Sequence, residues 1–444
     1  MSYVNYNLKT GIEPDYIIDD DGCLFDRWCF SHYPYVAVYL DFITESEDGT
    51  SYSFDFVTSY GLDAYMYYLG DIPIIRDINI SSQIGTYIQL INVKEPLHIE
   101  EKQYYLLKLD TLDVDRIIPE VTPLYMSVYN YANIEGEDAM IPELIPLPGF
   151  NGIVYDGPAF PKPQITSWSS DNLKLKVNNV GRGNWNEIVV DNKTEVVYDI
   201  GTYIEKKFRD SYVDELIGNH QYNNHNPVLI ISHWDLDHYN VLLFMSNNER
   251  EQFSQLIVTS TLPSLTPFRL LQEVVKNTKV ELTLVNNNSK LLTASVNYID
   301  VNNPVLKLFV CPVKMNGSKF NTNESGLLLD IDVEDKNILL TGDCTYTQAS
   351  DALQQSYAQI KGDKDHYLVV PHHGGGHNPK YQLPSRCKLK TAILSVDELK
   401  EDSKGVVVRH RYGHPTIEVV YHFIKDHNCK LLRTDYANED ILIG

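Results

Sequence analysis

The feature that most constrains the fold is the alternation of apolar and amphipathic segments from Leu173 to the end of this 444-residue chain. Short apolar segments such as PVLIISH and NILLTGD predict buried strands, and longer periodic segments predict helices near 206–219, 268–277, 347–360 and 416–425. Several of the predicted strands run directly into histidine or aspartate. Because sites in α/β folds lie at the carboxyl ends of strands, this pattern predicts an α/β domain with its chemistry at one sheet edge.

The first third of the chain has a different character. Residues 1–141 are dense in tyrosine and contain short alternating segments separated by turn signals such as DDDGC, which predicts a smaller β-rich domain. Residues 142–170 are rich in proline and glycine, and we interpret them as a linker or an irregular wrap. A chain of this length exceeds one ordinary core, so we expect two domains, 1–141 and 171–444.

The charge is concentrated in that first third. The net charge of the chain is −23. Residues 1–165 hold about 8 Lys and Arg against about 26 Asp and Glu, whereas the remainder is closer to neutral. So acidic a segment argues against nucleic-acid binding there. It is compatible with a protein partner, with self-association, or with simple packing against the rest of the chain.

Other bulk properties exclude several protein classes. The six cysteines form no CxxC pair, so neither a zinc ribbon nor a disulfide framework is predicted. No apolar segment reaches the roughly 20 residues of a membrane helix, and the N-terminal residues lack the pattern of a secretory signal. We therefore expect a cytoplasmic protein without a membrane association.

The strongest chemical signal is the sequence HWDLDH, which directly follows a predicted buried strand. In a turning loop, His233 and Asp235 can face one metal ion while Asp237 and His238 face a second. Imidazole and carboxylate are the ligands that zinc and related ions prefer. The alternative, a charged turn without a ligand, is less consistent with four such side chains within six residues.

Two further strands deliver residues of the same kind. NILLTGD ends in Asp343, a carboxylate placed to bridge two ions, and VVPHHGGGH ends in His372 and His373. Neighbouring side chains on a strand point to opposite sides, so we expect one of the two histidines to bind metal and the other to orient substrate or support a ligand. The sequence leaves open which one is the ligand.

Two weaker signals flank these strands. In RHRYGHP, His414 can close the second metal position, and Arg409 and Arg411 supply positive charge for an anionic substrate, which His410 could also contact. Taken alone, the motif is better explained as a surface cluster of arginine and histidine. Asp199 ends the strand of VVYDIG. It either orients a ligand side chain or caps the helix that follows.

Taken in order, these motifs resemble the metallo-β-lactamase superfamily. The closer resemblance is to the hydrolase domain of ComEC-type DNA-uptake proteins and their stand-alone relatives. It covers about 270 residues from Val177 onward. The segments that carry it are VNNVGRGNWNEI, VVYDIG, SHWDLDH, NESGLLLDI, ILLTGDC, VVPHHGG, AILSV, RYGHP and LLRTD.

The resemblance implies a four-layer αβ/βα sandwich with a two-metal site. Six residues fall on ligand positions, together with His372 or His373: His233, Asp235, Asp237, His238, Asp343 and His414. There are two departures from the usual pattern. Asp235 stands where a second histidine is usual, and no histidine occurs between His238 and His366, where many members carry a ligand.

Relatives of the ComEC type are expected to cleave phosphodiesters. The resemblance therefore implies a metal-dependent hydrolase, a nuclease or phosphodiesterase, that uses two divalent ions (zinc or manganese) on a nucleic acid or nucleotide. In that reaction Asp237 would orient the attacking water, while His410 and His414 would contact the substrate or its leaving group. The alternatives are a hydrolase of a lactone or thioester, and a partner-binding subunit of a larger assembly.

Overall fold

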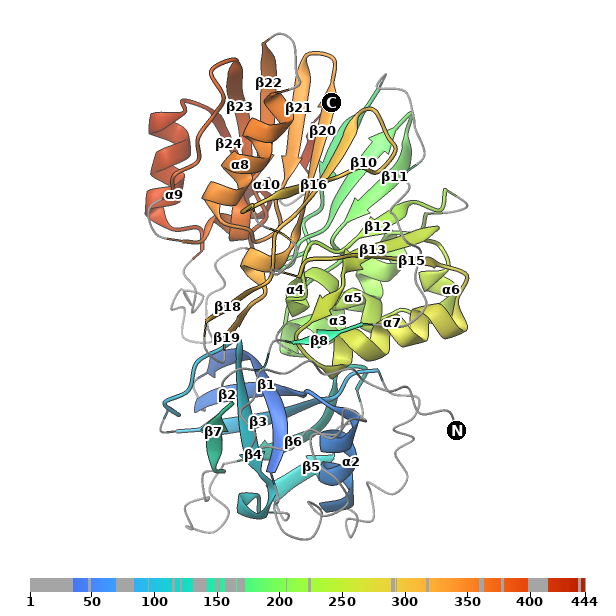
Figure 1. Cartoon of the computed structure of the whole chain (residues 1–444), viewed down its shortest axis with the longest axis vertical. Coiled ribbons are helices and arrows are strands. Elements are labelled where there is room, and N and C mark those ends of the chain that lie inside the picture. The colour runs from blue at the N-terminus through green and yellow to red at the C-terminus, as the bar shows by residue number, and fades with distance from the viewer. Residues whose placement is uncertain are drawn as a thin grey trace. The chain divides into compact units, whose positions relative to one another are not determined.

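The computed structural model describes most of the chain between Tyr35 and Ile443. It does not describe residues 1–34, 47–48, 69–83, 95, 114–115, 120–121, 131–141, 148–149, 151, 156–164, 166–171, 205, 223–224, 289–291, 293, 317–318, 359–362, 377–378, 398–413, 438–440 and 444. The chain forms two compact units (Figure 1). Unit 1 comprises Met1–Gly157 and two later segments, Thr261–Glu273 and Met315–Asn321, and unit 2 comprises the rest.

Unit 1 is built around a nine-stranded sheet with the order β18-β19-β4-β1-β2-β3-β6-β5, in which β7 also pairs with β4. Its strands are β1 Tyr35–Ser46, β2 Gly49–Phe56, β3 Tyr87–Val93, β4 Gln103–Lys108, β5 Ile117–Pro119, β6 Tyr125–Asn130, β7 Leu144–Pro146, β18 Lys314–Asn316 and β19 Lys319–Asn321. The helix α2 (Ser59–Tyr68) and the 3-10 turn η3 (Leu109–Thr111) accompany this sheet. The described part of the first third is thus β-rich, as predicted.

Unit 2 contains two seven-stranded sheets. The first has the order β15-β13-β12-β11-β10-β9-β25, and its strands from β11 to β15 run parallel. Its members are β9 Lys174–Val177, β10 Asn186–Val190, β11 Lys193–Tyr198, β12 Val228–Ile230, β13 Gln255–Thr259, β15 Glu281–Val285 and β25 Ile441–Ile443. Helices α3 Lys206–Asn219, α4 Leu236–Tyr239, α5 Val241–Phe244 and α6 Asn247–Arg250 lie between these strands in the sequence, and α7 Leu265–Asn277 begins in unit 1 and ends in unit 2.

The second sheet has the order β16-β17-β20-β21-β22-β23-β24, and its last four strands run parallel. Its members are β16 Asn297–Ile299, β17 Leu306–Val310, β20 Leu327–Val333, β21 Lys336–Leu340, β22 Lys364–Val369, β23 Cys387–Leu394 and β24 Lys430–Arg433. The helical elements that accompany it are α8 Tyr346–Tyr357, α9 Ile417–Tyr421, a π-helical turn His422–Asp426 and α10 Thr434–Ala437, with 3-10 turns at Asn323–Ser325 and Pro371–Gly374.

Alternate residues of the second sheet face two different cores. On β20, Leu327, Leu329 and Ile331 join a core shared with Val196 and Ile230 of the first sheet. Their neighbour Leu328 joins a second core with buried residues of α8 and α9. Because side chains on a strand alternate between its faces, this division shows that the sheet is covered on both sides.

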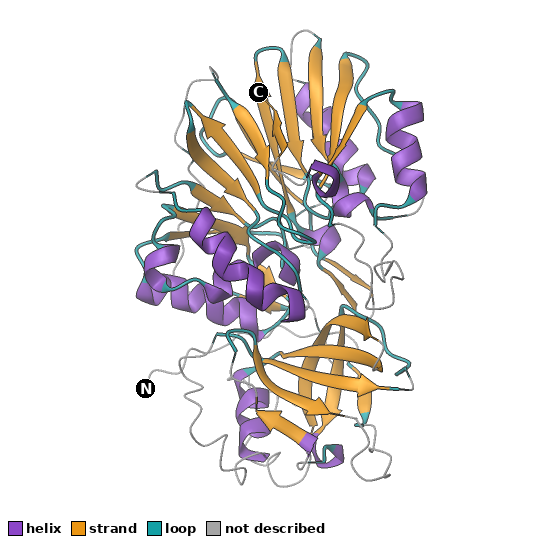
Figure 2. Ribbon diagram, turned by 180° about the vertical axis from the view of Figure 1, so that it is seen from behind, coloured by secondary structure: helices purple, strands orange, loops and turns teal. Residues whose placement is uncertain are grey.

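Helices also lie on the outer side of the first sheet (Figure 2), which completes four layers. The α/β sandwich predicted for this part of the chain is therefore confirmed, and the predicted helices fall within a few residues of α3, α7, α8 and α9. No helix in the described ranges is long and apolar enough to span a bilayer.

A buried carboxylate on β20 makes the stability of unit 2 depend on pH. Asp330 accepts hydrogen bonds from the Asn337 amide and the Ser356 hydroxyl. Burial nevertheless raises its pKa to about 6. Because the folded pKa exceeds the ordinary value near 4, this group stabilises the fold most at low pH, and that contribution falls as the pH rises from about 4 to 6.

We expect Asp330→Asn, which cannot titrate, to lose this dependence. Between about pH 5.5 and pH 7.5 the wild-type free energy of unfolding should fall by about 0.8 kcal/mol relative to that of the variant. Urea denaturation at the two pH values measures the difference. A wild-type-minus-variant difference that stays constant with pH would contradict the assignment.

Candidate metal centre

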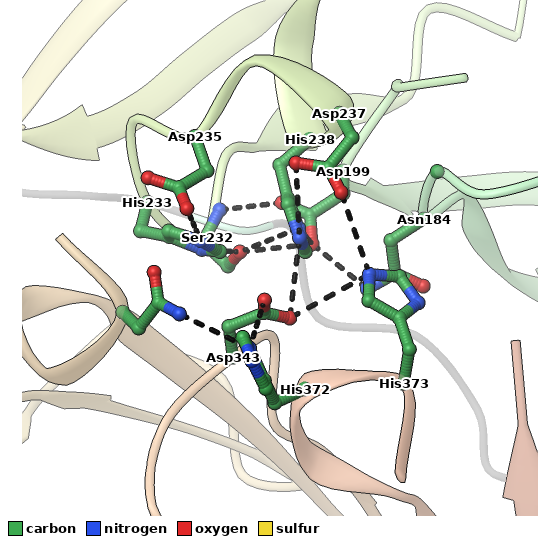
Figure 3. A network of polar contacts seen from close by, with 12 residues as sticks. Asn184, Asp199, Ser232, His233, Asp235, Asp237, His238, Asp343, His372 and His373 are labelled. Atoms are coloured by element: carbon green, nitrogen blue, oxygen red, sulfur yellow. Dashed lines mark hydrogen bonds and ion pairs between the residues drawn. The ribbon is translucent and has the colours of Figure 1, made fainter. Parts of the chain in front are cut away.

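The candidate centre forms where strands β11 and β12 of the first sheet and strands β21, β22 and β23 of the second sheet end. Figure 3 shows the polar side chains that meet there. Asp199 follows β11, and the loop 232–238 follows β12. Asp343 follows β21, the pair His372 and His373 follows β22, and Ser395 follows β23. The predicted strand-end motifs are therefore brought to one place, although they are distant in the sequence.

Two overlapping groups of side chains have the spacing of metal ligands. Ligand atoms of His233, His238 and Asp343 lie within 4.8 Å of one another, and so do those of Asp237, His238 and His373. Asp343 adjoins both groups, because its Oδ1 lies 3.2 Å from His238 Nε2 and 3.7 Å from His373 Nε2. His373 Nε2 in turn lies 3.7 Å from Asp237 Oδ2.

The hydrogen bonds of the three imidazoles fix which nitrogen faces this cluster. His238 Nδ1 donates to Asp199 Oδ2 at 2.9 Å, and His373 Nδ1 donates to the Ser395 carbonyl at 2.8 Å. The Ser232 hydroxyl donates to Asp199 and therefore accepts from His233 Nδ1 at 2.9 Å. With the proton on Nδ1, each Nε2 carries a lone pair.

Those Nε2 atoms are buried and have no hydrogen-bond partner among the described residues. Three buried acceptors without a donor are costly in a protein interior, and a bound cation removes that cost. A proton on the outer nitrogen that is held by a carboxylate or carbonyl is also the usual support of a metal-bound histidine. The residues present therefore fit divalent metal ions.

The charges at the centre favour the same conclusion. Burial alone would lower the pKa of His238, but the carboxylates of Asp343 and Asp199 hold that pKa well above its ordinary value. Burial alone would raise the pKa of Asp343, but the surrounding His238, His372 and His373 hold it well below its ordinary value. The carboxylates thus favour a positive charge beside them, which either a proton on His238 Nε2 or a cation bound to the neutral ring supplies.

Asp235 lies at the edge of the cluster. The Thr322 hydroxyl donates to its Oδ1, and its Oδ2 lies 3.7 Å from His233 Nε2. Asp235 is not a member of either three-residue group. It is oriented toward the same position as His233, which is the position expected from the sequence.

The two adjacent histidines divide between different neighbours. Both adopt a left-handed backbone, each with φ of 51°, within the 3-10 turn Pro371–Gly374 rather than in an extended strand. His373 joins Asp237 and His238. His372 Nδ1 lies 2.6 Å from Asp343 Oδ2 and 3.0 Å from the Asn323 amide nitrogen, and its side chain is about one-third exposed. The structure therefore favours His373 as the ligand of the second position.

His414 lies beside the centre, next to His372. The His414 ring packs edge-on against His372, with ring centroids 4.8 Å apart, so it adjoins the centre without being a member of either ligand group. Gly375 permits this arrangement, since a Cβ there would lie 2.3 Å from His372 Cδ2 and 2.4 Å from His414 Cε1. Arg409, His410 and Arg411 lie outside the described residues.

Several supporting residues carry no signal of their own in the sequence. The Asn184 amide donates to Asp199 at 3.0 Å, and its backbone N–H donates to the Asp237 carbonyl at 3.2 Å. Ser232, Thr322 and Ser395 contribute the hydroxyl and carbonyl contacts described above. Asp199 itself orients His238, and α3 begins only at Lys206, so the helix-capping alternative for Asp199 is wrong.

No family model and no curated protein matches this chain. Three solved structures are similar to it at 9% identity. Tm1679, described as a metal-dependent hydrolase of the β-lactamase superfamily, has a TM-score of 0.34 and covers 62% of this chain and 99% of its own. The metallo-β-lactamase fold protein YhfI from Bacillus subtilis has a TM-score of 0.34, and the match covers 61% of this chain and 99% of YhfI. Zn²⁺-bound PqqB from Methylobacterium extorquens has a TM-score of 0.33, and the match covers 61% of this chain and 99% of PqqB. The ligand assignments rest on the geometry of this chain.

The carboxylate at position 235 leads to a prediction about metal preference. Replacing imidazole by carboxylate shifts a site toward harder ions. We therefore expect apo-protein reconstituted with Mn²⁺ to be at least as active as protein reconstituted with Zn²⁺. Asp235→His, which replaces the carboxylate by an imidazole, should shift the preference toward Zn²⁺. Activity with Zn²⁺ alone in the wild type would contradict the prediction.

Proposed function

We propose that this protein is a metal-dependent hydrolase that holds two divalent ions and cleaves phosphodiesters. The observation that carries the proposal is the convergence of three buried imidazole Nε2 atoms on Asp343, each set by a hydrogen bond on the opposite ring nitrogen. His233 and Asp235 would hold one ion, while Asp237, His238 and His373 would hold the other. Asp343 would be shared, because its ligand oxygen lies within 4.8 Å of the ligand nitrogens of His233 and His238, and its Oδ1 lies 3.7 Å from His373 Nε2.

Bound divalent ions lower the pKa of water and offset negative charge on a phosphate. The side chains of the centre supply the remaining functions. Asp237 is more exposed than His238 and Asp343, with 19% of its side-chain surface accessible against 0% and 5%. Because it is the more accessible carboxylate, Asp237 would hold the attacking water and accept its proton.

His372 and His414 face the position where substrate would bind. The partial exposure of His372, next to the nearly buried Asp343, lets its imidazole meet a phosphate oxygen or the leaving group. The basic residues of RHRYGHP add positive charge to the segment that ends in His414. This positive charge favours an anionic phosphodiester substrate, in a nucleic acid or a nucleotide, over a neutral lactone.

A substrate panel tests the proposal. Protein loaded with Zn²⁺, Mn²⁺ or Mg²⁺ should hydrolyse bis-p-nitrophenyl phosphate and at least one of single-stranded DNA, RNA or a cyclic nucleotide. Lactones and thioesters, assayed beside them, should react far more slowly. Metal analysis of the same preparations should give about two ions per chain. Hydrolysis of a lactone or thioester without any phosphodiesterase activity would overturn the substrate assignment.

A further inference from the structure

A second set of histidines lies outside the candidate centre, at the end of α9. His422 begins the π-helical turn His422–Asp426, and His427 follows it. The wider spacing of a π-helical turn brings the two rings together, with His427 N–H donating to the His422 carbonyl at 3.3 Å. Their Nε2 atoms lie 3.0 Å apart. Such π-helical turns frequently occur at functional sites.

The surrounding contacts give these nitrogens the properties of metal ligands. His422 Nδ1 donates to Asp426 Oδ2 at 2.8 Å, which leaves its Nε2 with the lone pair. A carboxylate behind an imidazole is the usual support of a metal-bound histidine. His427 Nε2–H donates to the Tyr381 carbonyl oxygen at 3.2 Å. A metal ion that displaces this proton to solvent would therefore meet the carbonyl oxygen as a third ligand.

We propose that His422, His427 and the Tyr381 carbonyl bind one divalent transition-metal ion of the copper or nickel type. For metal–nitrogen bonds of about 2.0–2.1 Å, two nitrogens 3.0 Å apart subtend an angle of about 95° at the metal. That angle suits the tetragonal N,O coordination of Cu²⁺ and Ni²⁺ better than the tetrahedral coordination of Zn²⁺. Solvent would complete the coordination, because both rings are only partly buried.

The site would join two segments of unit 2. Tyr381 is buried, and its hydroxyl lies 2.6 Å from His366 Nε2 beneath the second sheet. His422 and His427 flank the turn that follows α9, and α9 begins three residues after His414. An ion bound here would therefore fix α9 and its π-helical turn to the segment around Tyr381, and would stabilise the folded chain.

The test uses full-length protein already loaded with Mn²⁺. Cu²⁺ binds nitrogen and oxygen ligands more tightly than Mn²⁺ and also enters the candidate centre, so the readout is the difference between the wild type and His422→Gln. Calorimetry and electron paramagnetic resonance should show one more Cu²⁺ per chain in the wild type, with nitrogen couplings from two imidazoles. His422→Gln and His427→Gln should each weaken this binding at least tenfold. Asp426→Asn should weaken it by about tenfold or more, as expected for a residue that supports a ligand.

His98→Gln, at an exposed histidine in unit 1, is the matched control and should leave the Cu²⁺ affinity unchanged. Ni²⁺ should also raise the melting temperature of the wild type more than that of His427→Gln. Equal Cu²⁺ affinity in the wild type and in both histidine variants would overturn the proposal. Asp343 variants leave His422 and His427 intact. If such a variant loses hydrolysis but keeps the Cu²⁺ site at His422 and His427, this site is distinct from the proposed catalytic one.

Discussion

Replacing Asp343 by Asn should lower the hydrolytic rate by at least about a thousandfold and should reduce the bound metal. The substitution conserves the size of the side chain but removes the one carboxylate that faces His238 on one side and His372 on the other. The asparagine amide has one neutral oxygen, so it cannot offset the positive charge of two bound ions as the carboxylate can. Metal content measured after gel filtration and the rate with bis-p-nitrophenyl phosphate are the two readouts.

Asp365→Asn is the matched control for this substitution. Asp365 lies on β22, the strand that delivers His372 and His373, but at its opposite end, where it pairs with Lys390 at 3.2 Å. It should therefore retain both the metal and the rate. Far-ultraviolet circular dichroism of Asp343→Asn should match that of the wild type, since the strands around it keep their apolar cores. A fully active Asp343→Asn protein would contradict the assignment of the centre.

Much of this centre could be predicted because its ligands follow strongly apolar strands. A segment such as VLIIS predicts a buried strand, and the parallel order of β11 to β13 and of β21 to β24 places the carboxyl ends of these strands at one edge of each sheet. The sequence alone could thus place His233, His238 and Asp343 together.

The choice between His372 and His373 could not be made from the sequence, because it depends on backbone conformation. Both residues adopt positive φ values, which is uncommon for residues other than glycine. In an extended strand they would have faced opposite sides of the sheet. In the observed turn, one ring contacts Ser395 and Asp237 while the other contacts Asp343 and Asn323.

The residues that support the ligands could not be predicted from the sequence either, because their roles also depend on the tertiary structure. Serine, threonine and asparagine are common in loops, so Ser232, Thr322 and Asn184 carry no distinctive pattern. Their roles follow from contacts between segments far apart in the sequence, such as Thr322 with Asp235 and Asn184 with Asp199. Tertiary structure alone provides that information.

Removing residues 1–170 should yield an insoluble or unfolded protein rather than a free-standing hydrolase. Unit 1 includes Thr261–Glu273 and Met315–Asn321, which come from the part of the sequence that otherwise forms unit 2. Strand β8 (Ile153–Val154) pairs with β14 (Thr261–Leu262), and β4 pairs with β19. The first third of the chain is therefore needed to cover these segments.

The contacts around Asp55 show what the deletion would expose. The Thr266 backbone N–H and hydroxyl both donate to the Asp55 carboxylate, at 3.0 and 2.9 Å, near the start of α7. The Tyr104 hydroxyl donates to the Pro263 carbonyl at 2.8 Å. The Phe268 ring is buried beside Tyr155. Without residues 1–170 these polar groups lose their partners and the apolar residues meet water, and both changes destabilise the fold.

Two substitutions in unit 1, one at a buried and one at an exposed carboxylate, should change the free energy of unfolding by different amounts. Asp55→Ala leaves the buried donors of Thr266 and Thr86 without an acceptor, so it should lower the free energy of unfolding by about 3 kcal/mol. Asp110→Ala, at an exposed carboxylate of the same unit, should have little effect. Urea denaturation of both variants, and the soluble yield of the deletion, are the measurements. A soluble, folded and active protein starting near Ser170 would show instead that the first third is a separable module, and would favour a role for it in binding a partner.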